Sequence, residues 1–168
     1  FLKSLNECLI LQFCKMNLIF SIKANKVTDP AQSVLLIEAG DRYCCLGSMT
    51  AAGKELQRLD YFTTGDADEE NLPRKILDTN SDWNERFHKV VIGYDFAEKI
   101  LVPDALYKYE DAEILLNAGF GTGVHTTIIA EPVTGRELHT VFRIPTAMYE
   151  WAAQKFTKVQ YFHTASLL

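Results

Sequence analysis

The chain has 168 residues, of which 17 are Lys or Arg and 22 are Asp or Glu, so its formal net charge is −5. Hydrophobic residues make up 48% and charged residues 23%, as in an ordinary globular protein of one domain. The acidic balance and the lack of a basic stripe exclude a typical nucleic-acid-binding surface and argue against an anionic membrane as partner.

The first residues of the chain are apolar, but Lys3, Glu7 and Lys15 interrupt them. The uncharged runs are too short for a membrane span, and a signal peptide does not carry such charges inside its apolar core. Residues 1–32 are therefore treated as an N-terminal segment without a membrane span. Either this segment packs on the domain, with a short strand or helix at Met16–Lys23, or residues 1–15 precede the natural start.

Four cysteines, at positions 8, 14, 44 and 45, form no C-x-x-C pair, so their spacing signals neither a zinc site nor a redox motif. Cys44 and Cys45 are adjacent on a predicted strand, where neighbouring side chains face opposite sides, so they are not expected to bridge each other. We expect buried thiols in a reducing compartment, which favours a cytoplasmic location.

The stretch from Ser33 to Thr64 holds three apolar runs separated by two short turns that contain glycine. This pattern predicts three antiparallel strands in a meander. Val34–Ile37 is apolar at each position, which predicts a central strand covered on both faces. The third run mixes apolar and charged residues, as expected near a sheet edge.

The acidic turn Gly65–Glu70 is expected to lead into a helix, because it lacks the Gly and distal Glu of a calcium loop. Apolar residues at helical spacing predict that helix over Asn71–Phe87, with Pro73 in its first turn and a break at Thr79–Ser81. The continuous apolar run Lys89–Tyr94 then predicts a buried parallel strand.

The remaining elements follow from short apolar runs and turn residues. In chain order we expect a strand at Ile100–Val102, a short turn of helix capped by Asp104, a helix over Glu110–Ala118 ended by Gly119, a hairpin of Val124–Val133 and Glu137–Ile144 around Thr134-Gly135, a helix opened by Pro145-Thr146, and a last strand over Val159–Leu168.

Three meander strands, a helix and a buried parallel strand are the opening order of a ribonuclease H-like α/β fold, a mixed sheet with helices on its faces. The same unit builds each half of the actin and heat-shock-chaperone ATPases, so element order favours an actin-like ATPase half over residues 33–168. The last predicted strand stops at Leu168 without a turn, and we expect this domain to be truncated at its C-terminus.

Ile100–Tyr107 followed by Ala112–Leu116 is similar to a signature of an uncharacterised Bacteroidota family, and so are Val141–Pro145 and Tyr161–Ser166. The resemblance implies a domain of unknown function with an actin-like ATPase-type fold. Members of that family are longer and contain a second ribonuclease H-like half, which implies that this chain is mainly the first half. Its layout also resembles the cytoplasmic actin-like proteins of type IV pilus and type II secretion machines.

The resemblance also implies where a nucleotide would sit. Actin-like ATPases hold phosphate and metal at an Asp-x-Gly turn after the first strand, where backbone N–H groups cradle the phosphates. The matching residues here are Glu38, Gly40 and Asp41, but no Ser or Thr lies in this turn. The residues that binding of ATP and Mg²⁺ requires are therefore only half present. A tight hairpin turn explains Gly40-Asp41 equally well.

Other candidate sites are weaker. Gly119–Gly123 lacks the Lys-Ser/Thr ending of a phosphate loop and follows a predicted helix, so we expect a helix end and a loop. A two-metal nuclease would need carboxylates that converge, for which Glu38, Asp78 or Asp82, and Asp95 lie on suitable elements.

The four histidines, His88, His125, His139 and His163, give no metal pair. A two-residue turn at Thr134-Gly135 would place His125 opposite Ile144 and His139 opposite Ala130, too far apart to share zinc.

Two hypotheses follow, and whether the protein is an enzyme stays open between them. The first is a non-catalytic domain that acts through protein–protein contacts, with a protein partner or a second copy of itself. The alternative is a nucleotide-binding ATPase domain whose site is completed by further sequence.

Overall fold

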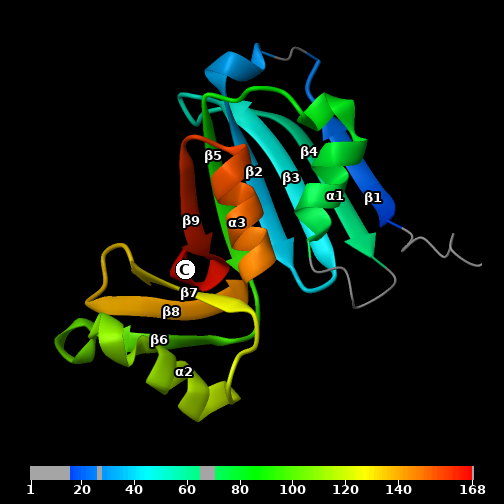
Figure 1. Cartoon of the computed structure of the whole chain (residues 1–168). Helices are drawn as coiled ribbons and strands as arrows, with labels where there is room; N and C mark the ends of the chain where they lie inside the picture. Colours follow the sequence, from blue (N-terminus) through cyan, green and yellow to red (C-terminus); the bar gives the residue numbers. More distant parts are fainter. Residues whose placement is uncertain (1–15, 26–27, 65–70, 168) are drawn as a thin grey trace, which may run out of the picture.

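The structure is a computed structural model that describes residues 16–25, 28–64 and 71–167. Two sheets make up most of it: a six-stranded sheet in the order β1-β4-β3-β2-β5-β9 and a three-stranded sheet in the order β6-β8-β7 (Figure 1). The strands are β1 Met16–Lys23, β2 Ser33–Gly40, β3 Tyr43–Thr50, β4 Leu56–Thr64, β5 Lys89–Asp95, β6 Lys99–Pro103, β7 Thr126–Pro132, β8 Leu138–Pro145 and β9 Val159–His163. The α-helices are α1 Leu72–Thr79, α2 Ala112–Phe120 and α3 Thr146–Lys155, and five short 3-10 helices are Pro30–Gln32, Ser81–Trp83, Asp104–Leu106, Tyr109–Asp111 and Thr164–Leu167.

The predicted meander is confirmed. β2 pairs antiparallel with β3, and β3 pairs antiparallel with β4. The predicted parallel strand is also confirmed, because β5 runs parallel to β2, and β9 runs parallel to β5. β1 continues the sheet beyond β4, so the expected N-terminal segment contributes a strand to it, whereas the expectation for residues 1–15 lies outside the described residues.

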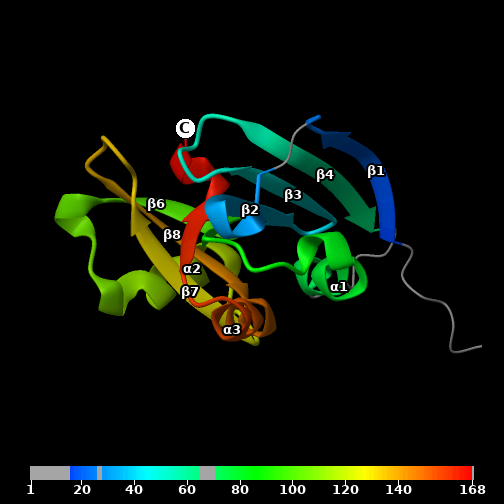
Figure 2. The same cartoon turned by 90° about the horizontal axis from the view of Figure 1, so that it is seen from above.

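The main core lies between one face of the large sheet and the helices α1 and α3, which both lie on that side (Figure 2). Alternate residues of β2 and β5 point into it, as Leu35, Ile37 and Ile92 do, and each is at most 1% exposed. Trp83 and Trp151 complete this core from the helix side. We call this the covered face.

The prediction that Val34–Ile37 is covered on both faces is wrong for one face. Burial alternates along β2: Leu35 and Ile37 are buried, whereas Val34 and Leu36 are only half-buried. β2 does lie mid-sheet, between β3 and β5, but within the described residues no α-helix packs on its other face. An unbroken apolar run therefore predicts that a strand lies in the middle of a sheet, but it does not predict which face of the sheet the helices cover. We call this side the open face.

The local signals around α1 act as expected. Asn71 Oδ1 accepts a hydrogen bond from the backbone N–H of Arg74 at 3.1 Å, and Pro73 lies in the first turn, where its missing N–H costs nothing. The helix ends at the predicted break, since Asn80 is its C-cap and its side chain then caps the short helix that begins at Ser81. The helix is therefore shorter than the predicted Asn71–Phe87.

The second sheet has its own small core of Val102, Ala112, Leu116 and Val141, formed with α2, while Phe142 and Ile144 of β8 pack into the main core.

Two predictions about this region are wrong. Gly119 lies within α2, and the helix ends at Gly121, whose φ of 81° and ψ of 179° form a backbone conformation that glycine adopts far more readily than other residues. Asp104 begins a 3-10 turn but caps nothing with its side chain, which instead lies 2.8 Å from His139 Nδ1.

The hairpin of β7 and β8 forms as predicted, but its register differs. The turn closes through hydrogen bonds between Val133 and Leu138 and between Arg136 and Val133, so it is longer than the assumed Thr134-Gly135 turn. Pro132 consequently lies opposite His139, and Thr127 lies opposite Ile144. The last strand is also shorter than expected, because β9 ends at His163 and a 3-10 helix follows.

Candidate functional site

The predicted site residues Glu38, Gly40 and Asp41 lie at the end of β2 and in the turn to β3, where the parallel strands β2 and β5 have their carboxyl ends. Ligands of open α/β sheets commonly bind at this end. Asp41 is exposed, Glu38 is half-buried on the open face, and Gly40 is buried. The ring of Tyr43 lies so close to Gly40 that a Cβ atom there would overlap it. The absence of a side chain at Gly40 therefore makes room for Tyr43.

Tyr43 joins two carboxylates from neighbouring parallel strands. Its hydroxyl oxygen lies 2.8 Å from Glu38 Oε1 and 2.8 Å from Asp95 Oδ2. The hydroxyl carries a single hydrogen, so the two carboxylates share one donor. Thr164, just after β9, donates to the other oxygen of Asp95 at 2.8 Å. Of the predicted nuclease carboxylates, the fold thus brings Glu38 and Asp95 together.

These contacts shift the acidities of the cluster. The hydrogen bonds from Thr164 and Tyr43 lower the pKa of Asp95 below its ordinary value. Burial, together with the two carboxylate neighbours, raises the pKa of Tyr43 well above that of a free phenol. Tyr43 therefore stays protonated at neutral pH and acts as a donor that holds the ends of β2, β3 and β5 together.

A trough of about 280 Å³ opens on the same face, beside this cluster. Its floor contains Gly47 of β3 and Gly93 of β5, two strand glycines that add no side chain to the surface. Its other lining residues come from five strands or their ends and are mainly apolar: Leu36, Ile37, Glu38, Cys45, Leu59, Val91, Phe162 and Thr164. The open face is therefore a hollowed apolar surface with a carboxylate at one end.

A row of three aromatic rings crosses the open face next to the trough. Tyr43 stacks on Tyr61 with ring centroids 5.6 Å apart, and Tyr61 stacks on Phe20 at 5.5 Å. Tyr61 and Tyr43 are half-buried, and Phe20 is 43% exposed. Partly exposed aromatic side chains of this kind are enriched in protein–protein interfaces.

The other predicted site residues lie elsewhere. Asp78 of α1 is near Lys155 of α3, and Asp82 pairs with Arg58, so neither joins Glu38 and Asp95. Gly121 to Gly123 follow α2 and lie beside Arg143, which donates to the Gly121 carbonyl at 2.9 Å. The glycine-rich stretch is a helix end and loop, as expected. The acidic turn Gly65–Glu70 lies outside the described residues.

The histidines and cysteines among the described residues belong to no group that could hold a metal ion. His125 lies at the start of the β7–β8 hairpin and His139 at its other end, opposite Pro132. Cys44 is buried on the covered face and Cys45 is half-buried on the open face, as their adjacent positions predicted, while Cys8 and Cys14 are outside the described residues. Over the described part of the chain, no group of three or more His, Cys, Asp or Glu residues has the arrangement of a metal site.

No helix within the described residues has both the length and the apolar character that a membrane crossing requires.

Residues 22–168 match the model of a family described as "Protein of unknown function (DUF3822)". The chain belongs to this family. A solved structure shares the fold of this DUF3822 protein: a protein from Bacteroides thetaiotaomicron VPI-5482 described as having an actin-like ATPase fold and unknown function, with a TM-score of 0.72 and 14% sequence identity. No curated protein matches the chain.

The match to the Bacteroides structure covers 82% of the DUF3822 chain and 54% of the other, so this chain spans about half the length of that protein. At this identity the likeness establishes the fold alone. Together with the mixed sheet and its meander, it confirms the actin-like ATPase fold expected from element order and from the resemblance.

An actin-like ATPase fold implies ATP and a divalent cation, and the turn after β2 is where its phosphates would lie. At this turn the Tyr43 ring occupies the space that a side chain at Gly40 would need, and the Tyr43 hydroxyl contacts the carboxylates of Glu38 and Asp95.

Sequence reasoning singled out Glu38 and Gly40, which lie in this cluster, but it did not point to Tyr43, Gly47 or Thr164. Tyr43 and Thr164 act through contacts with Asp95, which lies 52 and 69 positions away in sequence, so no local pattern points to them. Gly47 and Gly93 did carry a signal, because glycine inside a strand often marks a close approach by another group.

Proposed function

We propose that this DUF3822 protein is a non-catalytic domain of actin-like fold that works by protein–protein contact through its open face. The observation that carries the proposal is the trough formed around Gly47 and Gly93 by apolar side chains that the described residues leave half-buried. Apolar surface of this kind is removed from water when a partner binds. The Tyr43 ring beside Gly40 and its hydrogen bond to Glu38 support a role without nucleotide chemistry, because they occupy side chains that a nucleotide site would use.

The partner that fits is a polypeptide segment with apolar side chains, such as one face of a helix. Two strand glycines leave a depression that bulky aliphatic or aromatic side chains would fill, and Tyr61 and Phe20 extend the contact surface beside it. The Bacteroides relative carries almost as much chain outside the matched part as within it, so proteins of this fold have further polypeptide that could supply such a segment.

Site-specific photocrosslinking in the natural full-length protein tests this proposal. A photoreactive amino acid at Leu36, in the trough, should form an adduct with one defined polypeptide segment, identified by mass spectrometry. The matched control position is Leu101, a 56% exposed leucine on β6 of the other sheet. The substitution Leu59→Glu, which places a charge in the same trough, should abolish the adduct at position 36.

The crosslinked segment distinguishes the occupants: a second copy of the chain, a further domain of the same chain, or another protein. Each of these is a protein contact on the open face. Equal, scattered labelling from positions 36 and 101 would contradict the proposal.

The alternative function is a nucleotide-binding ATPase whose site is completed by further sequence. The observation that favours it is the pair of carboxylates at the carboxyl ends of β2 and β5. Thermal unfolding of the full-length protein with and without Mg-ATP separates the two functions, because a ligand at 100 times its Kd stabilises the folded state by about 2.7 kcal/mol. We expect no change in Tm, and a rise that Glu38→Gln abolishes would show nucleotide binding at this turn and contradict the proposal.

A further inference from the structure

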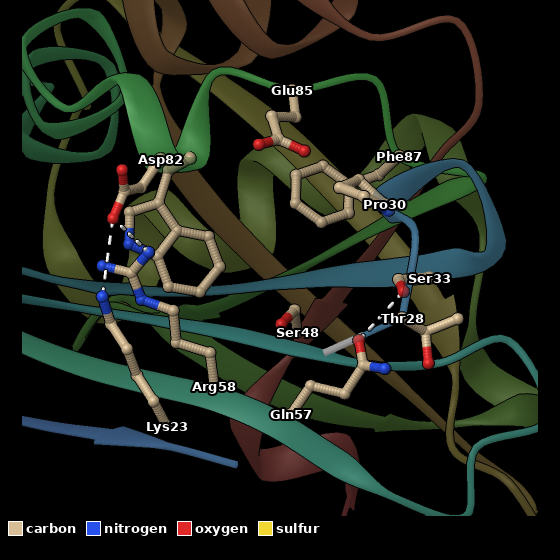
Figure 3. Close-up of a pocket in the computed structure, with 11 residues that line it drawn as sticks. Lys23, Thr28, Pro30, Ser33, Ser48, Gln57, Arg58, Asp82, Glu85 and Phe87 are labelled. Carbon is tan, nitrogen blue, oxygen red and sulfur yellow. Dashed lines mark hydrogen bonds and ion pairs between the residues drawn. The ribbon is translucent and has the colours of Figure 1, made fainter. Parts of the chain in front are cut away.

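A second cavity, of about 190 Å³, lies at the opposite end of the molecule from Glu38 and Asp95. It is bounded by Ser33 at the start of β2 and by Phe87 just before β5, so it lies at the amino ends of the parallel strands. Figure 3 shows its lining side chains, which come from β1, β3, β4 and the two connecting segments around Pro30 and Trp83. The position is distinct from the open face and from the phosphate turn.

The cavity is shaped by an irregularity in β4. Ser48 of β3 pairs with Arg58, but the next residue, Met49, pairs with Leu56, so Gln57 is an extra residue in the strand. This bulge brings two consecutive residues, Gln57 and Arg58, to line the same cavity. Bulges next to binding sites commonly redirect a side chain in this way.

The bulge places the amide of Gln57 at the cavity. Gln57 is 3% exposed, and its Oε1 accepts a hydrogen bond from Ser33 Oγ at 3.0 Å. Within the part of the chain that the structure describes, its amide nitrogen has no hydrogen-bond partner, and neither has the hydroxyl of Ser48, which is 5% exposed. Both atoms are accessible from the cavity, so a polar ligand there can pair with them.

The side walls are aromatic and rigid. The indole of Trp83 donates to Asp60 at 2.8 Å, and the guanidinium of Arg58 lies 4.5 Å from the centre of the Trp83 ring. Phe87 and Pro30 form the wall across the cavity (Figure 3). Aromatic walls of fixed orientation favour a flat apolar ring between them.

The charged residues on the rim balance one another. Lys23 and Arg58 both pair with Asp82, at 3.5 and 3.0 Å, and Glu85 adds a second carboxylate. Two cations and two anions thus line the cavity, and three of the four are engaged with each other. The rim offers no excess charge that would select an anion or a cation, which favours a neutral ligand.

We propose that this cavity binds a small, neutral, flat molecule whose ring carries an amide, with the size of a nucleobase or an aryl carboxamide. An amide supplies both a carbonyl acceptor and an N–H donor, which together satisfy the free Gln57 amide nitrogen and the Ser48 hydroxyl. A cavity of 150 Å³ admits benzene, so about 190 Å³ admits a substituted ring. The site does not depend on the proposed protein-contact function.

NMR titration of the ¹⁵N-labelled protein with benzamide and uracil tests the proposal. Both compounds should shift the indole N–H resonance of Trp83 and the side-chain amide resonances of Gln57 in a saturable way. Ligands of this size bind in roughly the millimolar range. Benzoate and benzylamine keep the ring but carry a charge, and they should bind at least about tenfold more weakly. Each can form only part of the hydrogen bonds to Gln57 and Ser48, and the rim of the cavity offers neither compound an unpaired charge of opposite sign.

Variants locate the binding. Gln57→Met keeps the length of the side chain but removes the amide, and should weaken benzamide and uracil about tenfold. Gln154→Met, the same change at an exposed position of α3, is the matched control and should leave both affinities unchanged. If Gln57→Met does not fold, Ser48→Leu serves as the second variant, since its larger side chain fills the cavity and should abolish binding.

Three results would overturn the proposal. The first is the lack of saturation by either amide at about ten times the expected Kd. The second is equal affinity for the neutral and charged ring compounds. The third is unchanged amide binding in Gln57→Met or Ser48→Leu, which would place the compounds elsewhere on the protein.

Discussion

Single side chains hold the junction between the two sheets, and His163 is the most constrained of them. It is fully buried, its Nδ1 lies 3.0 Å from the backbone N–H of Ala165, and its Nε2 lies 3.0 Å from the Phe96 carbonyl. The N–H of Ala165 can only donate, so Nδ1 accepts, and Nε2 carries the hydrogen that is donated to Phe96. The fold therefore requires the neutral ring.

Acidification should destabilise the protein through His163. Burial lowers the pKa of this histidine below its ordinary value of 6.5, so the folded state binds fewer protons than the unfolded state. The stability that this histidine contributes is present above pH 6.5 and is lost as the pH falls through that value towards the lower pKa of the folded state. His163→Gln should cost about 1–3 kcal/mol at pH 8, and the difference from wild type should shrink between pH 7 and pH 5.

Urea unfolding of both proteins at several pH values measures this dependence. Comparing the two proteins at each pH removes most of the contribution of Glu131. Burial raises the pKa of this carboxyl group, so its effect on the pH dependence of stability has the opposite sign. His88→Gln, the same substitution at an exposed histidine, is the matched control for the change of residue type. A constant difference between wild type and His163→Gln from pH 8 to pH 5 would show that the ring does not need to be neutral.

At the scale of elements, local signals decided what the sequence could predict. The meander, the break of α1 at Thr79–Ser81 and the parallel strand β5 were all predicted, because capping residues, turn glycines and apolar runs act over a few residues. The β7–β8 register and the open face were not, because a turn length and the placement of helices depend on the whole fold. The site divides in the same way: Glu38 and Gly40 stand out locally, whereas Tyr43 acquires its role only through Asp95.

Two glycines at the end of α2 should respond in opposite directions to the same substitution. Gly119 lies inside the helix, and a Cβ there would meet nothing within 4 Å, so Gly119→Ala should stabilise the protein by about 0.5–1 kcal/mol. Gly121 has a φ of 81°, which an L-residue adopts at a cost, so Gly121→Ala should destabilise it by about 1–2 kcal/mol.

Thermal and urea unfolding of the two variants measure this contrast, and each serves as the control for the other because they lie two positions apart. Destabilisation by Gly119→Ala would place the helix end at Gly119, as local sequence signals suggested. Stabilisation by both would mean that Gly121 is not held at its positive φ.

At the scale of the whole molecule, the described residues leave apolar side chains open to solvent in three places, of which the third is the segment around α2 with Leu106, Ile114 and Phe120. The open face carries the trough around Gly47 and Gly93, and β1 exposes Leu18, Ile19, Phe20 and Ile22, each by at least 43%. β1 is also the last strand of its sheet in the described residues, and it contains an extra residue, Ile19, in its pairing with β4. Such an irregularity disfavours further strand pairing at an edge, so the open face is the stronger contact surface.

The 168-residue chain on its own should therefore associate, and the open face should drive this association. Light scattering over a range of concentrations should show an average mass that rises above 19.0 kDa, since unpartnered apolar surface is removed from water in a complex. Leu36→Lys places a charge in the trough and should return the protein towards a monomer, whereas Leu101→Lys on the second sheet should not. Leu18→Lys separates the two surfaces, because Leu18 lies opposite the core residue Phe62 and not on the open face. Loss of association in this variant but not in Leu36→Lys would assign the contact to β1. A monodisperse monomer at all concentrations would contradict the prediction for both surfaces.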